Sequence, residues 1–130
     1  MARILGIGGV FFKAKDTSAL VAWYRDVLGL DMASWGGVFL PSGPMAAQPG
    51  AGAVFSPFSA NTTYFEPSKK EFMINFVVDD LDGVLDRCRK HGVEAKVMPD
   101  ESNGRFAHIM DPDGTRIELW QPKAPDAVEA

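Results

Sequence analysis

The chain carries the same capped-helix pattern twice, and the two copies lie 63 residues apart. In the first copy, Asp16 can cap a helix whose apolar residues recur every three or four positions and which ends at Gly29. In the second copy, Asp79-Asp80 is the predicted cap, and aligning Asp16 with Asp79 places Gly29 on Gly92, so the two helices have the same length. Such regular spacing indicates an internal duplication, so the chain should fold as two similar halves.

Each half also predicts strands around its helix. In the first half, residues 4–15 are β-prone, and two further short β-prone pieces follow the helix at 31–40 and 51–57. The segment between those two pieces, 41–50, is rich in proline and glycine and is predicted to be a loop. In the second half, a strand is expected at 72–78, directly before the helix. The order of elements therefore repeats with the helices.

Neither half is large enough to close a hydrophobic core by itself, so the two should pack on each other or on another chain. We expect a single domain over residues 1–130, with module one at about 4–60 and module two at about 70–121. The composition is 46% apolar and 23% charged, which is typical of globular proteins and argues against a disordered chain.

Charge and hydropathy exclude several classes of function. The net charge is −4 and there is no basic run, so we expect neither nucleic acid nor an anionic membrane surface as a partner. No apolar run approaches the roughly 20 residues of a membrane-spanning helix. The N-terminal string MARILGIGGVFF is interpreted as a strand rather than a signal peptide. The single Cys88 cannot form an intramolecular disulfide, which fits a cytoplasmic protein.

The last β-prone stretch, GRFAHIMDPDGTRIELWQP, predicts a hairpin with a five-residue loop from Asp111 to Thr115. In this register one face of the hairpin is wholly apolar and should cover the helices. That face holds Ala107, Ile109, Ile117 and Leu119. The opposite face is mixed and holds Phe106, His108, Met110, Arg116, Glu118 and Trp120. A four-residue loop would instead place Glu118 among apolar residues, so the five-residue register is preferred.

Three segments resemble the vicinal oxygen chelate superfamily, which includes glyoxalase I, extradiol dioxygenases, fosfomycin resistance proteins and bleomycin resistance proteins. They are IGGVFFKAKDTSALVAWYRDVLGL, FMINFVVDDLDGVL and MDPDGTRIELW, and with them the resemblance covers nearly the whole chain. It implies an α+β, glyoxalase-like fold in which paired βαβββ modules form a curved mixed sheet around a pocket. Such motifs are specific for the fold and poor guides to the reaction.

The metal enzymes that the chain resembles hold a divalent cation with four side chains, one from each of four strands. Carried over onto this sequence, the first position is Gly9, the third is Met73, and the second falls near Phe55 or Ser56. Only the fourth, Glu118, is a usual ligand. Glycine has no donor, and a thioether is a poor ligand for such cations. The resemblance therefore implies a pocket without the usual four-ligand metal site and without a cofactor.

The strongest candidate pair is His108 and Glu118, which lie opposite each other in the predicted hairpin, within hydrogen-bonding reach. They could form a catalytic acid–base pair, a metal-ligand pair or a satisfied polar pair. Asn75 is the one polar residue in an otherwise apolar strand and needs a partner, from the ligand or the backbone. Lys13 and Arg116 share the pocket side and are interpreted as charges at its rim.

Aromatic side chains are abundant enough to form a box for a flat ligand, although many must also belong to the core. The pocket candidates among them are Phe11, Trp35, Phe55, Phe106 and Trp120. The preferred hypothesis is a metal-free homodimer that binds a small, partly aromatic molecule, as the bleomycin resistance members do. The alternative is a metal-dependent lyase or dioxygenase of the same superfamily, with a displaced metal site at Glu118 and His108.

Overall fold

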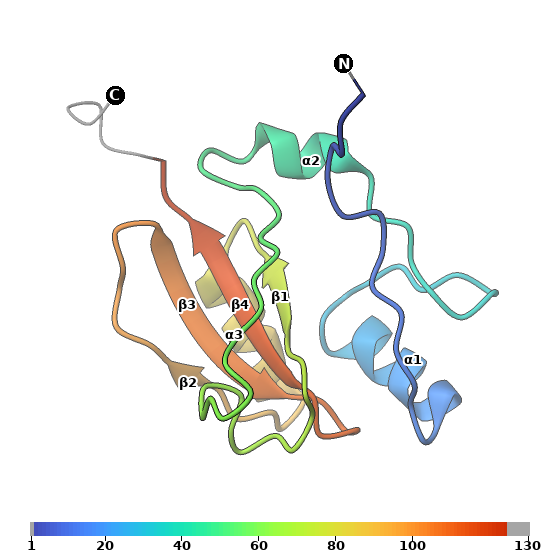
Figure 1. Cartoon of the computed structure of the whole chain (residues 1–130). Coiled ribbons are helices and arrows are strands. Elements are labelled where there is room, and N and C mark those ends of the chain that lie inside the picture. The colour runs from blue at the N-terminus through green and yellow to red at the C-terminus, as the bar shows by residue number, and fades with distance from the viewer. Residues whose placement is uncertain (1, 125–130) are drawn as a thin grey trace.

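The computed structural model describes residues 2–124, and its sheet lies entirely in the second half of the chain (Figure 1). In chain order the elements are α1 (Thr17–Asp26), α2 (Ser42–Ala47), β1 (Ile74–Val77), α3 (Leu81–Lys90), β2 (Lys96–Val97), β3 (Gly104–Met110) and β4 (Arg116–Pro122). Within the described residues, no helix combines the length and the apolar character needed to cross a membrane.

The sheet is mixed and open, with the strand order β1-β4-β3-β2. β4 pairs in parallel with β1 and antiparallel with β3, and β3 pairs antiparallel with the short β2. Figure 1 shows α3 against one face of this sheet, α1 beside the β1 edge, and the chain between α2 and β1 crossing the opposite face. The expected α+β fold with a mixed sheet is confirmed.

Both predicted helices form, and each has ten residues. Asp16 and Asp80 are the N-caps, and each carboxylate accepts a hydrogen bond from the backbone N–H three residues further on. The second cap is Asp80 rather than Asp79, so the helix starts are one residue farther apart than the duplication predicted. After the helices, Gly29 and Gly92 adopt φ of 72° and 73°, the left-handed conformation that glycine takes without strain.

The hairpin β3–β4 has the predicted register, because His108 pairs with Glu118 and Met110 pairs with Arg116 across a five-residue turn. Its apolar face is the centre of the core. The four residues of that face are at most 3% exposed, and they pack with side chains from both helices. The cluster takes Leu20, Tyr24 and the C-cap residue Val27 from α1, and Leu81 and Cys88 from α3.

The first half differs from the prediction. Residues 4–15, 31–40 and 51–57 form no strand, and large apolar side chains in them are exposed, among them Phe11 at 94% and Phe39 at 80%. A strand is stable only when a neighbour satisfies its backbone groups, and these pieces have no such partner in the described chain.

The predicted loop at 41–50 is also partly wrong, because it contains α2. Its Pro44 falls in the first helical turn, where a missing N–H costs nothing.

Candidate ligand-binding site

The sheet face away from α3 carries a polar cluster centred on Glu118, which is only 8% exposed. Its carboxylate accepts hydrogen bonds from Tyr64 Oη at 2.5 Å and from Asn75 Nδ2 at 2.8 Å. Its third neighbour is His108 Nε2, at 2.7 Å. The β4–β1 and β4–β3 pairings place Asn75 and His108 on either side of Glu118, so strand register builds most of this cluster.

Arg116 sets the hydrogen-bonding roles of the two ring nitrogens of His108. Its guanidinium contacts Nδ1 of the imidazole and also bonds the backbone carbonyl of Tyr64. Because arginine offers only donors, Nδ1 of His108 must accept, which leaves the ring proton on Nε2 to be donated to Glu118. Arg116, His108 and Glu118 therefore form one chain of hydrogen bonds in which a cation and an anion compensate each other.

The cluster keeps Glu118 ionised and Tyr64 protonated at neutral pH. Burial alone would raise the pKa of Glu118, but hydrogen bonds from His108, Tyr64 and Asn75 outweigh burial and hold that pKa below its usual value. Burial, followed by the hydrogen bond to Glu118, raises the pKa of Tyr64 to about 12. A carboxylate with three donors around it is well suited to hold a wall of a pocket in place and poorly placed to act as a free base.

The residues at the four carried-over ligand positions do not fit a divalent metal. Gly9 has no donor, Met73 offers only a thioether, and Phe55 is 85% exposed. Glu118 is already engaged by three donors and is linked through His108 to a cationic arginine. Over residues 2–124, no three His, Cys, Asp or Glu side chains gather closely enough to hold a metal ion.

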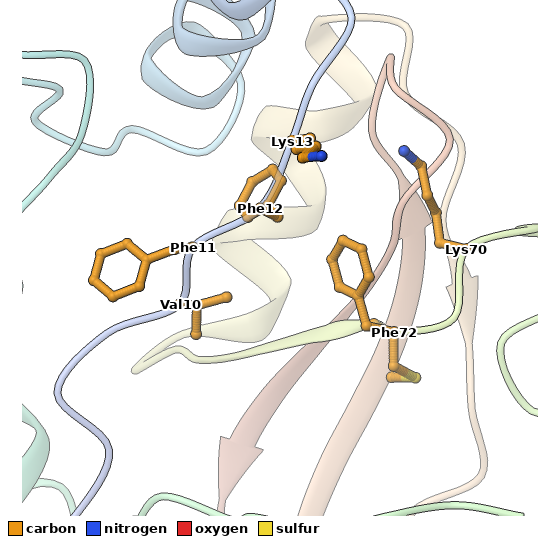
Figure 2. Close-up of a pocket in the computed structure, with 7 residues that line it drawn as sticks. Val10, Phe11, Phe12, Lys13, Lys70 and Phe72 are labelled. Carbon is orange, nitrogen blue, oxygen red and sulfur yellow. The ribbon is translucent and has the colours of Figure 1, made fainter.

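A cavity of about 620 Å³ opens between residues 10–13 and residues 70–73 (Figure 2). Its lining consists of Val10, Phe11, Phe12, Lys13, Lys70, Phe72 and Met73. The rings of Phe12 and Phe72 approach to 5.8 Å between centroids across it. The volume and the mainly apolar lining are those of small-molecule sites in proteins.

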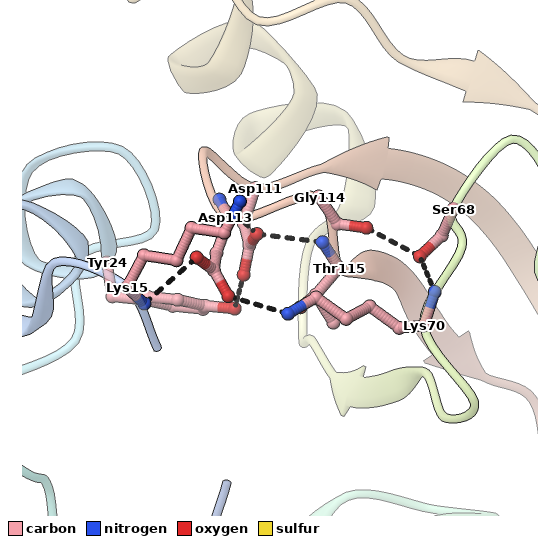
Figure 3. Close-up of polar contacts among 8 residues, drawn as sticks. All are labelled: Lys15, Tyr24, Ser68, Lys70, Asp111, Asp113, Gly114 and Thr115. Carbon is pink, nitrogen blue, oxygen red and sulfur yellow. Dashed lines mark hydrogen bonds and ion pairs between the residues drawn. The ribbon is translucent and has the colours of Figure 1, made fainter. Parts of the chain in front are cut away.

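The turn between β3 and β4 anchors both walls of this cavity (Figure 3). Asp113 accepts a hydrogen bond from the backbone N–H of Lys15 at 3.3 Å and pairs with Lys70 Nζ at 2.8 Å. The neighbouring Asp111 accepts from Tyr24 Oη of α1 at 2.7 Å. Burial and this bond to a carboxylate raise the pKa of Tyr24, which stays protonated and donates. The β3–β4 turn thus contacts α1, the chain directly after residues 10–13, which form the first wall of the cavity, and Lys70 of residues 70–73, which form the second wall.

The structure divides the predicted site residues into separate groups. Phe11, Lys13 and Met73 line the cavity, whereas His108, Glu118, Asn75 and Arg116 form the polar cluster. Phe106 and Trp120 stack on each other at 5.9 Å with nearly parallel rings. Trp35, Phe55 and Gly9 belong to none of these groups and lie exposed.

Sequence reasoning missed Tyr64, Lys70, Phe12 and Phe72. Tyr64 lies in the polar segment between the two predicted modules, and Lys70 lies at the start of the second module, where no pattern of residues points to a site. The signal that could have found Tyr64 is the aromatic pair that it forms with its neighbour Phe65 in this otherwise polar stretch. Phe12 and Phe72 sit one residue away from predicted pocket residues, and strand alternation assigned them to the opposite face.

Comparison with known proteins gives a family match over most of the chain. A family model described as "Glyoxalase/Bleomycin resistance protein/Dioxygenase superfamily" matches residues 6–119. No curated protein matches the sequence significantly.

Among solved structures, TnmS3, an antibiotic binding protein from Streptomyces sp. CB03234, aligns with 95% of this chain and 100% of its own, at 17% identity and a TM-score of 0.59. A protein from the mobile metagenome of V. Pseudocholerae aligns with 93% of this chain and 97% of its own, at 18% identity and a TM-score of 0.57. At this identity the likeness shows a shared fold.

A glyoxalase/bleomycin resistance protein from the same Streptomyces strain is 31% identical, but over only 38% of this chain and 45% of its own, with a TM-score of 0.35. This chain therefore spans less than half the length of that relative.

Proposed function

This chain belongs to the Glyoxalase/Bleomycin resistance protein/Dioxygenase superfamily, and we propose that it binds a small, partly aromatic molecule without using the usual four-ligand metal site. The observation that carries the proposal is the cavity of about 620 Å³ with phenylalanine and methionine side chains in its walls. A flat ring can stack against Phe12 and Phe72 there, and aromatic contacts add to the free energy of burial. The antibiotic binding described for TnmS3, which shares the fold, supports the same type of function.

The alternative, a metal-dependent lyase or dioxygenase at Glu118 and His108, has weaker support. The 2.7 Å contact does bring two side chains together that are able to bind a metal. However, each would have to give up its present partners, and Glu118 would lose its bonds to Tyr64 and Asn75. Removing one partner of a buried hydrogen bond costs about 1–3 kcal/mol. We therefore propose that the cluster shapes the sheet face beside the ligand.

We also propose that the protein is a cytoplasmic homodimer whose two modules form one domain and whose second copy covers the apolar segments of module one. The chain exposes 9489 Å² of solvent-accessible surface, whereas a monomer of this mass typically exposes about 6,700 Å². A standard interface buries about 800 Å² per partner, so the excess is large enough for an extensive one. The single cysteine, Cys88, is free and buried, as suits a reducing compartment.

The ligand proposal is tested with naphthalene-2-carboxamide, a neutral flat molecule, by isothermal titration calorimetry or ligand-observed NMR. We expect binding to the parent protein, and we expect Phe12→Ser to weaken it about fivefold because the substitution removes one of the two rings against which the ligand stacks. The matched control is Phe39→Ser, since Phe39 is also exposed but lies outside the cavity. Absence of binding to the parent, or equal losses in both variants, would contradict the proposal.

A further inference from the structure

The cavity is apolar except at two positions, and both of these are lysines. Lys13 comes from the first wall and Lys70 from the second, whereas the other five lining residues are Val10, Phe11, Phe12, Phe72 and Met73. In Figure 2 the two ammonium groups lie at the same end of the view, beyond the ring of Phe72. Two cations from separate segments thus line one apolar cavity.

Lys70 is held in position rather than free to rotate. Its Nζ pairs with Asp113 at 2.8 Å, and Asp113 is itself fixed by the backbone N–H of Lys15. The Lys70 side chain is about 30% exposed, so this charge is partly withdrawn from water. An ammonium group has three donors and Asp113 engages one of them, which leaves two for a ligand.

Lys13 carries the uncompensated charge of the cavity. Within residues 2–124 its side chain makes no hydrogen bond or ion pair, whereas Asp113 offsets the charge of Lys70. In the polar cluster on the sheet, the charges of Arg116 and Glu118 offset each other, because both side chains contact His108. The net charge at the cavity lining is therefore positive, although the whole chain carries −4.

We propose that the cavity selects aromatic molecules that bear a carboxylate, with the ring packed against Phe12 and Phe72 and the carboxylate held by Lys13 and Lys70. The inference rests on the proposed function and adds the chemical class of the ligand. Ammonium groups donate short, charge-assisted hydrogen bonds to carboxylates, and such bonds are stronger than those between neutral groups. Lys70 is preset by Asp113, so less side-chain entropy is lost when the ligand binds.

The test compares naphthalene-2-carboxylate with naphthalene-2-carboxamide, which has the same ring and no charge. Isothermal titration calorimetry should show that the parent protein binds the carboxylate about fivefold more tightly, as expected for one partly exposed ion pair. Lys13→Met should remove this preference, so that the carboxylate and the carboxamide bind the variant with similar affinity. Lys13 has no partner in the described chain, so the substitution should not disturb folding.

Two control variants show whether the preference for the carboxylate arises from contacts in the cavity or from the net charge of the protein. Lys69→Met removes a charge from the residue next to Lys70, but Lys69 does not line the cavity, so the preference should persist. Lys70→Arg keeps the charge and the pairing with Asp113, and it should also retain the preference. Raising the salt concentration from about 50 mM to about 500 mM should reduce the difference in the parent protein's affinity for the two ligands, because salt screens the ion pair.

The outcomes distinguish this inference from the function on which it rests. Carboxylate selection would be overturned if the parent bound both ligands with equal affinity, or if Lys13→Met lowered the affinity for both ligands by the same factor. Either result would leave the binding of aromatic molecules intact. A preference that disappears equally in Lys69→Met would also overturn carboxylate selection, because overall charge would then be the cause. Failure of the parent to bind either ligand would overturn both proposals.

Discussion

The two halves of this protein begin alike and end differently. Each has a ten-residue helix with an aspartate cap and a left-handed glycine after it. In the second half, the strands that follow bury their apolar face against both helices. In the first half, the corresponding segments 31–40 and 51–57 stay unpaired and carry exposed Trp35, Phe39 and Phe55. The repeated helix pattern in the sequence is therefore not sufficient to give both halves the same strands.

The connection between the strands contributes to this difference. In the second half, β3 and β4 are joined by a five-residue turn, so each finds its partner locally. In the first half, ten residues with several prolines and glycines separate the β-prone pieces, and part of this connection folds into α2. Longer connections cost more entropy to close, and strands without a local partner depend on contacts from elsewhere.

The largest expected effect is on assembly. If a second copy covers the first half, static light scattering at micromolar concentration should give twice the 14.1 kDa of one chain. Replacing two exposed apolar residues by aspartate, Phe39→Asp with Phe55→Asp, should halve that mass, because two charges would be buried in the interface. A parent protein that scatters as a single chain would break the proposal, and the unpaired half would then be a property of the monomer.

The next effect concerns the core of the second half. Leu119 is 1% exposed, and Leu119→Ala should lower the free energy of unfolding by about 3 kcal/mol through lost burial and a residual cavity. Leu40→Ala, at a residue 59% exposed in the first half, should cost less than about 1 kcal/mol in protein diluted until it is monomeric. Both values come from urea denaturation, and similar losses would show that the two halves are equally packed.

A third prediction tests the tie between α1 and the hairpin turn. Tyr24→Phe removes the hydroxyl that donates to Asp111 and should lower the free energy of unfolding by about 2 kcal/mol, since the carboxylate stays buried. Asp111 also accepts from two backbone N–H groups of the turn, so Asp111→Ala should cost more. If Tyr24→Phe is neutral, α1 is held by apolar packing alone.

The smallest effect is the pH dependence that arises from Glu118. Its folded-state pKa is lowered, so its contribution to stability is present above its unfolded pKa and is lost as the pH falls through the folded value. As the pH falls below about 5, the parent should therefore lose more free energy of unfolding than Glu118→Gln does.

Urea denaturation at several pH values measures this difference. Glu94→Gln, at an exposed residue with no hydrogen bond in the described chain, serves as the control and should behave as the parent does. A Glu118→Gln protein with the parent's acid dependence would mean that the three hydrogen bonds to Glu118 do not stabilise its ionised form.

The sequence by itself determined the features that depend on near neighbours. Helix periodicity and caps placed α1 and α3, and the composition of the turn fixed the hairpin register. With the register came the buried apolar face and the pairing of His108 with Glu118, ten residues apart. Each of these follows from backbone geometry and side-chain alternation within one or two elements.

Only the tertiary structure decided which distant segments meet. Tyr64 reaches Glu118 across 54 residues of sequence, and Lys13 and Lys70 line one cavity from segments more than fifty residues apart. It also decided that the first half leaves its β-prone segments without partners. Such contacts depend on how whole elements pack and on the entropy of closing long loops, and no local pattern of residue types encodes either quantity.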